Sequence, residues 1–279
     1  MSRKLKMELR RRHISKNSLY CYLTSKKDPQ MLLIPVISII SAEMLIYSGH
    51  VQAGIILHVI TMLSLSIIVM WIPESHISRS FQVLALLPLL RLLNMSMPVY
   101  SEMTLYFFAF IYVPLLLPAY LVIRHQGMNL QSIGLTSRKL LIYIPLSFIV
   151  GGMIGWGESM IIPAANLVPD LSVASLLKLS IVMIFIVGFV EELIFRSLLQ
   201  TRMESSFGML RGLLIASLLF GVMHSGYGTF QEIMYAFCAG MVLGYMFQRT
   251  GSLPLVSLTH GFVNIFLFGF IPLLPYFKA

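Results

Sequence analysis

The stretch FVEELIFRSLLQ, Phe189 to Gln200, places two adjacent glutamates and an arginine inside a long apolar run. Ionised side chains are costly in the hydrocarbon core of a membrane, so they are kept there when they face a partner or a wet cavity. Glu192 and Arg196 are four residues apart, share one face of a helix and can pair with each other. Glu191 points about 100° away. A snorkelling acid beside a buried ion pair is the structural alternative.

The composition is typical of a polytopic membrane protein. The chain has 279 residues, of which 57% are hydrophobic and 11% charged, whereas soluble domains carry about 25% charged residues. Nine of the twenty Lys and Arg residues fall within the first thirty positions, directly before the first apolar run. This pattern predicts a cytoplasmic anchor on anionic lipid. No nucleic-acid-binding motif accompanies the net charge of +9, so we expect no nucleic-acid partner.

The two cysteines and the N-terminus give no further indication of the function. Cys21 lies in the basic tail and Cys238 in an apolar run, which predicts neither a structural disulfide nor a cysteine metal site. The basic region is long and no small-residue cleavage site follows it, so we expect an uncleaved first span rather than a signal peptide.

Repeated apolar runs predict an all-α polytopic membrane protein, a bundle of about eight to nine transmembrane helices with a buried intramembrane site. The run at 81–98 is the weakest, because Arg91 and Asn94 interrupt it. The runs lie at 31–48, 54–73, 81–98, 103–123, 140–157, 173–199, 210–226, 229–248 and 252–272.

Basic residues alternate between the loops. With the N-terminus in the cytoplasm, sixteen of the twenty fall on the cytoplasmic side, and only Lys278 falls on the other. The sequence therefore predicts a cytoplasmic N-terminus. We also expect Glu43 and Arg91, both in the outer halves of their spans, to pair and hold the N-terminal bundle together.

Small residues recur at the spacing of closely packed membrane helices. The pairs are Gly151 with Gly155 and Gly240 with Gly244. Both pairs predict close approach to a neighbouring helix.

Two more polar groups stand in later apolar runs. FGVMH ends at His224, and HGFVN carries His260 and Asn264 on one helical face. Each alone is more often a satisfied core residue or interhelical glue, worth about 0.6 kcal/mol per hydrogen bond. Counted from the cytoplasmic helix ends, Glu191 and His260 lie about 12–13 Å deep and His224 about 20 Å deep. This convergence favours one shared intramembrane site.

These groups have the chemistry of water activation. A carboxylate beside an imidazole can deprotonate a water and later protonate a leaving amine. A second imidazole with an amide can stabilise an oxyanion. No Ser or Cys at suitable depth has an obvious base, so the sequence predicts direct attack by water on an amide or ester.

In order along the chain, the three motifs resemble the signatures of the CPBP family, which contains type II CAAX prenyl endopeptidases and bacteriocin-processing or self-immunity proteins. The motifs are Glu191-Glu192-x-x-Phe195-Arg196, Phe220-x-x-x-His224 and His260-x-x-x-Asn264. The resemblance covers about residues 130–272. It divides the chain into a basic tail (1–30), transmembrane helices of unassigned role (31–128) and a catalytic core (129–279).

The resemblance implies an intramembrane endopeptidase that cuts a membrane-associated peptide or protein near the cytoplasmic face. It implies that Glu191 and His224 activate water, and that His260 and Asn264 form the oxyanion hole. The implied supporting residues are Glu192, Arg196, Phe195 and Phe220.

Metal use is a separate question. Family members are commonly labelled metalloproteases, and Glu191, His224 and His260 could bind zinc with an open position. The chain has no H-E-x-x-H, and the family's structural picture favours a glutamate-dependent mechanism. We therefore expect no metal cofactor, with zinc as the alternative.

Other functions are compatible with the same motifs. The main alternative is a non-proteolytic scaffold or bacteriocin self-immunity protein that uses the same fold. A proton-coupled transporter is disfavoured, because no inverted repeat or pair of broken helices is evident. The compact loops favour a bacterial cell membrane, where peptide pheromones, bacteriocin leaders or membrane proteins are the expected substrates.

Overall fold

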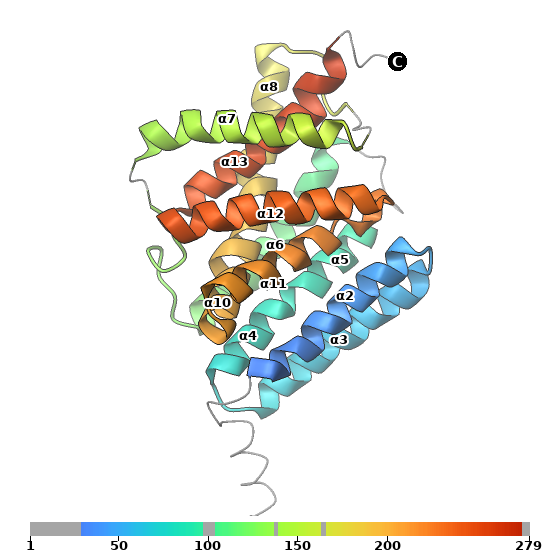
Figure 1. Cartoon of the computed structure of the whole chain (residues 1–279), viewed down its shortest axis with the longest axis vertical. Helices are drawn as coiled ribbons and strands as arrows, with labels where there is room; N and C mark the ends of the chain where they lie inside the picture. Colours follow the sequence, from blue (N-terminus) through green and yellow to red (C-terminus); the bar gives the residue numbers. More distant parts are fainter. Residues whose placement is uncertain (1–28, 97–103, 137–138, 163–165, 275–279) are drawn as a thin grey trace, which may run out of the picture.

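The computed structural model describes residues 29–96, 104–136, 139–162 and 166–274, and within these ranges all regular secondary structure is helical (Figure 1). Among these described residues, eight helices are long and apolar enough to cross a membrane. The expectation of an all-α polytopic membrane protein is therefore confirmed. The expected basic tail lies almost wholly outside the described residues, as do Cys21 and Lys278.

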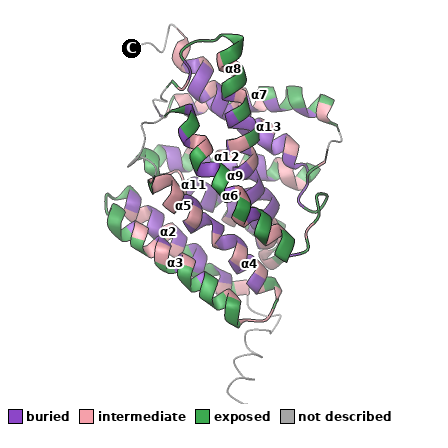
Figure 2. Ribbon diagram, turned by 180° about the vertical axis from the view of Figure 1, so that it is seen from behind, coloured by how far each residue is buried: buried purple, intermediate pink, exposed green. Residues whose placement is uncertain are grey.

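The N-terminal part contains a helical hairpin and three further helices. The helices are α2 (Leu33–Tyr47, preceded by the 3₁₀ turn η1, Pro29–Leu32), α3 (Val51–Trp71), α4 (His76–Leu84), α5 (Leu86–Ser96) and α6 (Leu105–His125). The outward faces of α2 and α3 are exposed and their inward faces are buried (Figure 2). The exposed face is apolar, with Trp71 84% exposed, as expected of a surface that contacts lipid.

The C-terminal part is built from α7, one long helix and three later spans. The elements are α7 (Leu140–Ser159), α8 (Val173–Ser180), η3 (Ile181–Gly188), α9 (Phe189–Glu192), η4 (Leu193–Gln200), α10 (Thr201–Phe207), α11 (Met209–Val222), η5 (Ser225–Tyr227), α12 (Phe230–Thr250), α13 (Leu253–Ile265), η6 (Phe266–Phe270) and η7 (Ile271–Leu273). Elements α8 to α10 form one continuous helix of 35 residues.

The predicted span at 81–98 is wrong as a single helix. Helix α4 begins at His76, and the chain breaks at Ala85 before α5. Pro88 explains the break, because it has no N–H to bond the carbonyl of Leu84 and its ring crowds the preceding turn. The N-terminal end of α4 contacts the end of α6, where Gln126 Nε2 donates to the Arg79 carbonyl (3.0 Å). The other end, on α5, reaches Glu43 of α2. The two short helices therefore traverse the bundle together, and the predicted alternation of loops is preserved.

The helical geometry of the long helix is irregular on both sides of the two glutamates. Its segments η3 and η4 are π-helical and flank the short α-helical turn Phe189–Glu192. Such wide turns are rare and occur often at functional sites. Gly188 allows close packing there, because a Cβ at this position would lie 2.7 Å from the Ser257 carbonyl oxygen of α13.

The two predicted glycine pairs do lie at close helix contacts. On α7, a Cβ at Gly151 would lie 2.6 Å from the Thr259 carbonyl oxygen, and one at Gly155 would lie 2.7 Å from that of Val263. On α12, a Cβ at Gly240 would lie 3.2 Å from the Phe220 ring, and one at Gly244 would lie 2.4 Å from the Leu213 side chain of α11. Helix α7 is thereby pressed against α13, the helix that carries His260 and Asn264.

Candidate active site

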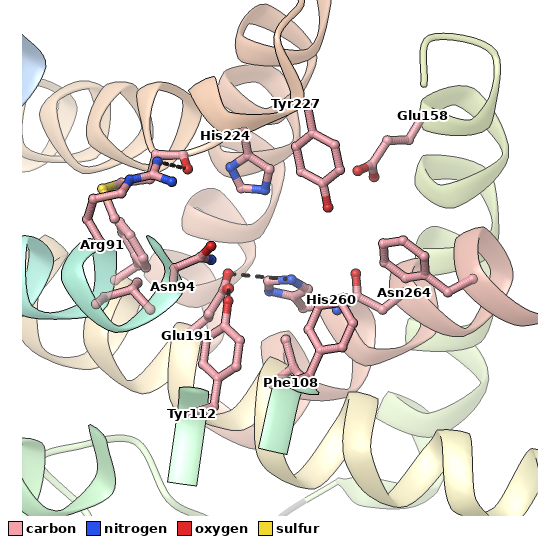
Figure 3. A pocket seen from close by; sticks show the side chains of 15 residues that line it. Arg91, Asn94, Phe108, Tyr112, Glu158, Glu191, His224, Tyr227, His260 and Asn264 are labelled. Carbon is pink, nitrogen blue, oxygen red and sulfur yellow. Dashed lines mark hydrogen bonds and ion pairs between the residues drawn. The ribbon is translucent and has the colours of Figure 1, made fainter. Parts of the chain in front are cut away.

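A cavity of about 100 Å³ lies where the three motifs meet, and Figure 3 shows the side chains that form its wall. Glu191, His224, His260 and Asn264 all line it. They come from the long helix, the end of α11 and α13. The structure therefore brings the four predicted site residues into one place.

Glu191 is held by a residue that lies outside the predicted catalytic core (129–279). It is 8% exposed, and the hydroxyl of Tyr112 on α6 donates a hydrogen bond to its Oε1 atom. Its Oε2 atom lies 3.7 Å from Nε2 of His260. One carboxylate oxygen is thus fixed by a tyrosine, while the other faces an imidazole across the cavity.

Glu192 forms the predicted pair with Arg196 and a second contact that was not predicted. Arg196 Nε donates to its Oε2 atom at 2.9 Å, and all of these side-chain atoms are fully buried. The Oε1 atom lies 2.8 Å from Nδ1 of His260. Glu192 therefore orients the His260 ring, and Nε2 is the ring nitrogen left to act in the cavity.

His224 lies on the opposite wall. Its Nδ1 atom is 2.9 Å from the Phe220 carbonyl oxygen, one turn earlier in α11. Within the described ranges, no hydrogen bond or ion pair joins His224 to Glu191. The imidazole that faces Glu191 directly is His260, and joint activation of a water by Glu191 and His224 stays a prediction.

Aromatic rings form the floor beneath these polar groups. Phe195 and Phe220 meet edge to face, with centroids 5.1 Å apart. The Arg196 guanidinium lies 4.7 Å from the centroid of Phe220, a cation–π contact. The ring of Phe220 also contacts His260, at 5.8 Å between centroids. The supporting residues thus pack as one block that fixes the catalytic candidates.

Asn264 has a free amide. It is 8% exposed and lines the cavity one helical turn after His260. Its side chain makes no hydrogen bond to any part of the chain that the structure describes. The amide is therefore available to a bound molecule.

The N-terminal helices support the site through a buried ion pair. Arg91 donates to both carboxylate oxygens of Glu43, at 2.7 and 2.6 Å, so the expected pair is present. Arg91 also donates to the Met223 carbonyl oxygen (2.5 Å), and the Ser225 hydroxyl donates to Glu43 (2.5 Å). These two contacts fall on the residues that flank His224. Helices α2 and α5 therefore fix the backbone on both sides of this histidine.

Sequence reasoning missed several residues of the cavity wall. They are Asn94, Phe108, Tyr112, Glu158 and Tyr227. Each is a single residue without a motif around it, so no local signal could have identified it. Those on α5 and α6 come from the region of unassigned role.

The long helix extends beyond the apolar run from which the predicted depth was counted. It continues to Phe207, so Glu191 lies sixteen residues, about 24 Å, from the C-terminal end of the helix. Glu158 is the next-to-last residue of α7, and Tyr227 lies in the turn after α11. The cavity therefore lies near the C-terminal ends of α7 and α11. Cleavage near the cytoplasmic face stays a prediction.

The three residues that could bind zinc line the cavity but are not grouped as a metal centre among the described residues. Nδ1 of His260 contacts Glu192, and its Nε2 faces Glu191. No group of three His, Cys, Asp or Glu side chains within the described ranges is arranged to hold a metal ion. The chemistry below is therefore derived from the side chains alone.

Comparison with known families supports the motif assignment. Residues 173–266 match the family model described as type II CAAX prenyl endopeptidase Rce1-like. The matched segment runs from the start of the long helix to just beyond Asn264 and contains all three motifs. Searches of curated proteins and of solved structures found no match. The match confirms the resemblance and supports a CAAX-type membrane protease.

Proposed function

We propose that this chain, whose residues 173–266 match the Rce1-like endopeptidases, hydrolyses a peptide bond of a membrane-associated peptide or protein within the bilayer. The reaction is glutamate-dependent and uses no metal. The observation that supports this proposal most directly is the convergence of four side chains on one cavity inside a bundle of apolar helices: Glu191, His224, His260 and Asn264.

Water is the nucleophile in this proposal. Glu191 accepts a proton from a water that lies between it and His224, while the water oxygen attacks the carbonyl carbon of the scissile bond. The hydrogen bond from Tyr112 holds the carboxylate in place, so that its free oxygen points into the cavity.

The negative charge that develops on the carbonyl oxygen is stabilised from α13. In its imidazolium form, His260 donates from Nδ1 to Glu192 and from Nε2 to this oxygen, and the side-chain amide of Asn264 is the second donor. Glu192, held by Arg196, fixes the His260 ring. When the carbon–nitrogen bond breaks, the proton held by Glu191 passes to the leaving nitrogen. The products are a carboxyl terminus and an amine.

We further propose that the protein lies in a bacterial cell membrane with its N-terminus in the cytoplasm. The distribution of basic residues supports this orientation. The basic tail would then contact the anionic lipids of the cytoplasmic leaflet.

The test compares the peptides and protein termini of membranes from cells that make the wild type, Glu191→Gln or Glu74→Gln. Gln keeps the size of the side chain but removes the base, so we expect a set of cleaved termini to vanish only in Glu191→Gln. Glu74 is half exposed and pairs with Arg79 at the surface, so Glu74→Gln is the matched control.

Thermal unfolding of each purified variant in detergent checks that the fold is kept. If a well-folded Glu191→Gln leaves every terminus in place, the protease proposal fails. A non-proteolytic scaffold or immunity protein would then be the better account.

A further inference from the structure

Two glutamates outside the three motifs face each other beside the cavity. Glu158, near the end of α7, is 8% exposed and lines the cavity, and Glu232, near the start of α12, is fully buried. Their carboxyl groups interact directly. In Figure 3, the Glu158 carboxyl group points inward beside Tyr227, across the cavity from Glu191.

This pair differs from every other buried glutamate of the described chain. Glu43 is bound by Arg91, Glu191 by Tyr112, and Glu192 by Arg196 and His260. In contrast, neither Glu158 nor Glu232 forms an ion pair with any basic side chain that the structure describes. Both carboxyl oxygens of Glu232 are buried, and apart from the contact with Glu158 they receive no hydrogen bond from a described residue.

An unpartnered acid pair at this depth is costly. A carboxylate in an apolar interior is strongly disfavoured unless a cation or hydrogen-bond donors compensate it. Two neighbouring carboxyl groups can ease this penalty by sharing a proton. A ligand that brings a positive charge would remove it, because one cation can attract both groups. Of the motif residues, His224 acts electrostatically on Glu232, but it forms no ion pair with either glutamate among the described residues.

We propose that Glu158 and Glu232 form a subsite for a positively charged nitrogen of the substrate, either a Lys or Arg side chain or a free amino terminus. Glu158 lines the same cavity as Glu191 and Glu232 lies behind it, so a cation bound at Glu158 would sit a short, fixed distance along the peptide from the scissile bond. The Tyr227 ring borders this wall and can contribute a cation–π contact. This inference rests on the proposed protease function and names its substrate class.

The experiment first collects the termini that depend on Glu191 and aligns the sequences around them. We expect either Lys or Arg at a constant position from the cut, or cuts at a constant distance from a free amino terminus. The first pattern identifies a basic side chain as the cation, and the second identifies the terminal amine.

The second step uses a synthetic peptide of the best-cut sequence, with purified enzyme in liposomes. Replacing the basic residue by norleucine, or acetylating the terminal amine, should slow cleavage by the wild type at least tenfold. In the double variant Glu158→Gln/Glu232→Gln, the charged and uncharged peptides should be cut at similar rates. Thermal unfolding checks the fold of the double variant, and the single variants Glu158→Gln and Glu232→Gln replace it where it is unstable.

The outcomes separate the two proposals. Glu191-dependent cuts without a basic residue or terminal amine at a constant position would overturn the subsite and leave the protease function standing. The double variant Glu158→Gln/Glu232→Gln could instead alter stability and keep the preference for charged peptides. That result would overturn the subsite, and the two acids would then form only a proton-sharing contact between α7 and α12. The absence of any Glu191-dependent cut would overturn the protease function and the subsite with it.

Discussion

The buried pair of Arg91 and Glu43 should contribute far more to stability than its position in an unassigned region implies. Arg91 makes two hydrogen bonds to the Glu43 carboxylate and one to the Met223 carbonyl oxygen, and both charged side chains are almost fully buried. Removing one partner of such a pair leaves the other charge buried without its main partner, which costs about 3–5 kcal/mol. Without Arg91, Glu43 keeps only the His58 ring at 3.0 Å and the Ser225 hydroxyl. A neutral interhelical hydrogen bond in a membrane would cost only about 0.6 kcal/mol.

Arg91→Met should therefore lower the free energy of unfolding by about 3–5 kcal/mol, and Glu43→Gln should lower it by a similar amount. The double variant removes both charges, so its cost should fall short of the sum of the single costs by at least about 2 kcal/mol. The assay is unfolding by SDS in mixed micelles, followed by circular dichroism.

The matched control is Arg79→Met. Arg79 forms a 2.6 Å ion pair with Glu74, but the two side chains are 38% and 50% exposed, so its loss should cost at most about 1 kcal/mol. The reasoning is refuted if Arg91→Met costs no more than Arg79→Met, or if the costs of Arg91→Met and Glu43→Gln are additive.

Four further predictions concern the site and its setting. Tyr112→Phe should reduce turnover about 10–100-fold without unfolding the protein, because the hydrogen bond to the Glu191 carboxylate is lost; unchanged turnover would remove Tyr112 from the site. Gly155→Ala should destabilise the fold by about 1–3 kcal/mol because its Cβ meets backbone, whereas Gly152→Ala meets only a ring of Phe266 and should be milder in the same unfolding assay; equal costs would contradict this. Two single cysteines, each introduced into a variant without native cysteines, test the orientation. Ser48→Cys should react with an impermeant maleimide in intact cells, whereas Met209→Cys should react only after permeabilisation. The reverse pattern would contradict the proposed orientation. Metal chelators should leave the cleavage rate unchanged, and a loss that zinc restores would contradict the metal-free mechanism.

Local spacing was a reliable guide wherever one helix contains both partners. The four-residue separation of Glu192 and Arg196 predicts their pair, and the structure contains it. The glycine pairs predict close helix contacts for the same reason. Glu43 and Arg91 lie on different helices, but their similar depth was enough to predict that they meet.

The sequence does not predict which residues of distant helices meet at the cavity. Nothing around Tyr112 or Glu158 marks either as part of the cavity, because their neighbours depend on how α6 and α7 pack. The contact between Glu191 and His260 was also not predicted, because it depends on how the long helix packs against α13.

The hydropathy pattern also predicted the end of one helix and the continuity of another incorrectly. The polar segment Thr201–Phe207 continues the long helix beyond its apolar run, so the helix ends at Phe207 rather than at residue 199. Pro88 divides the run at 81–98 into α4 and α5, and hydropathy alone does not register this break.

The most direct measurement of the central claim is the single-turnover rate of purified protein in liposomes on a peptide identified from its Glu191-dependent termini. We predict that Glu191→Gln lowers this rate by at least about 100-fold while thermal unfolding is unchanged, and that Glu74→Gln cuts at the wild-type rate. Cleavage at the wild-type rate by a well-folded Glu191→Gln would contradict the assignment of Glu191 as the base.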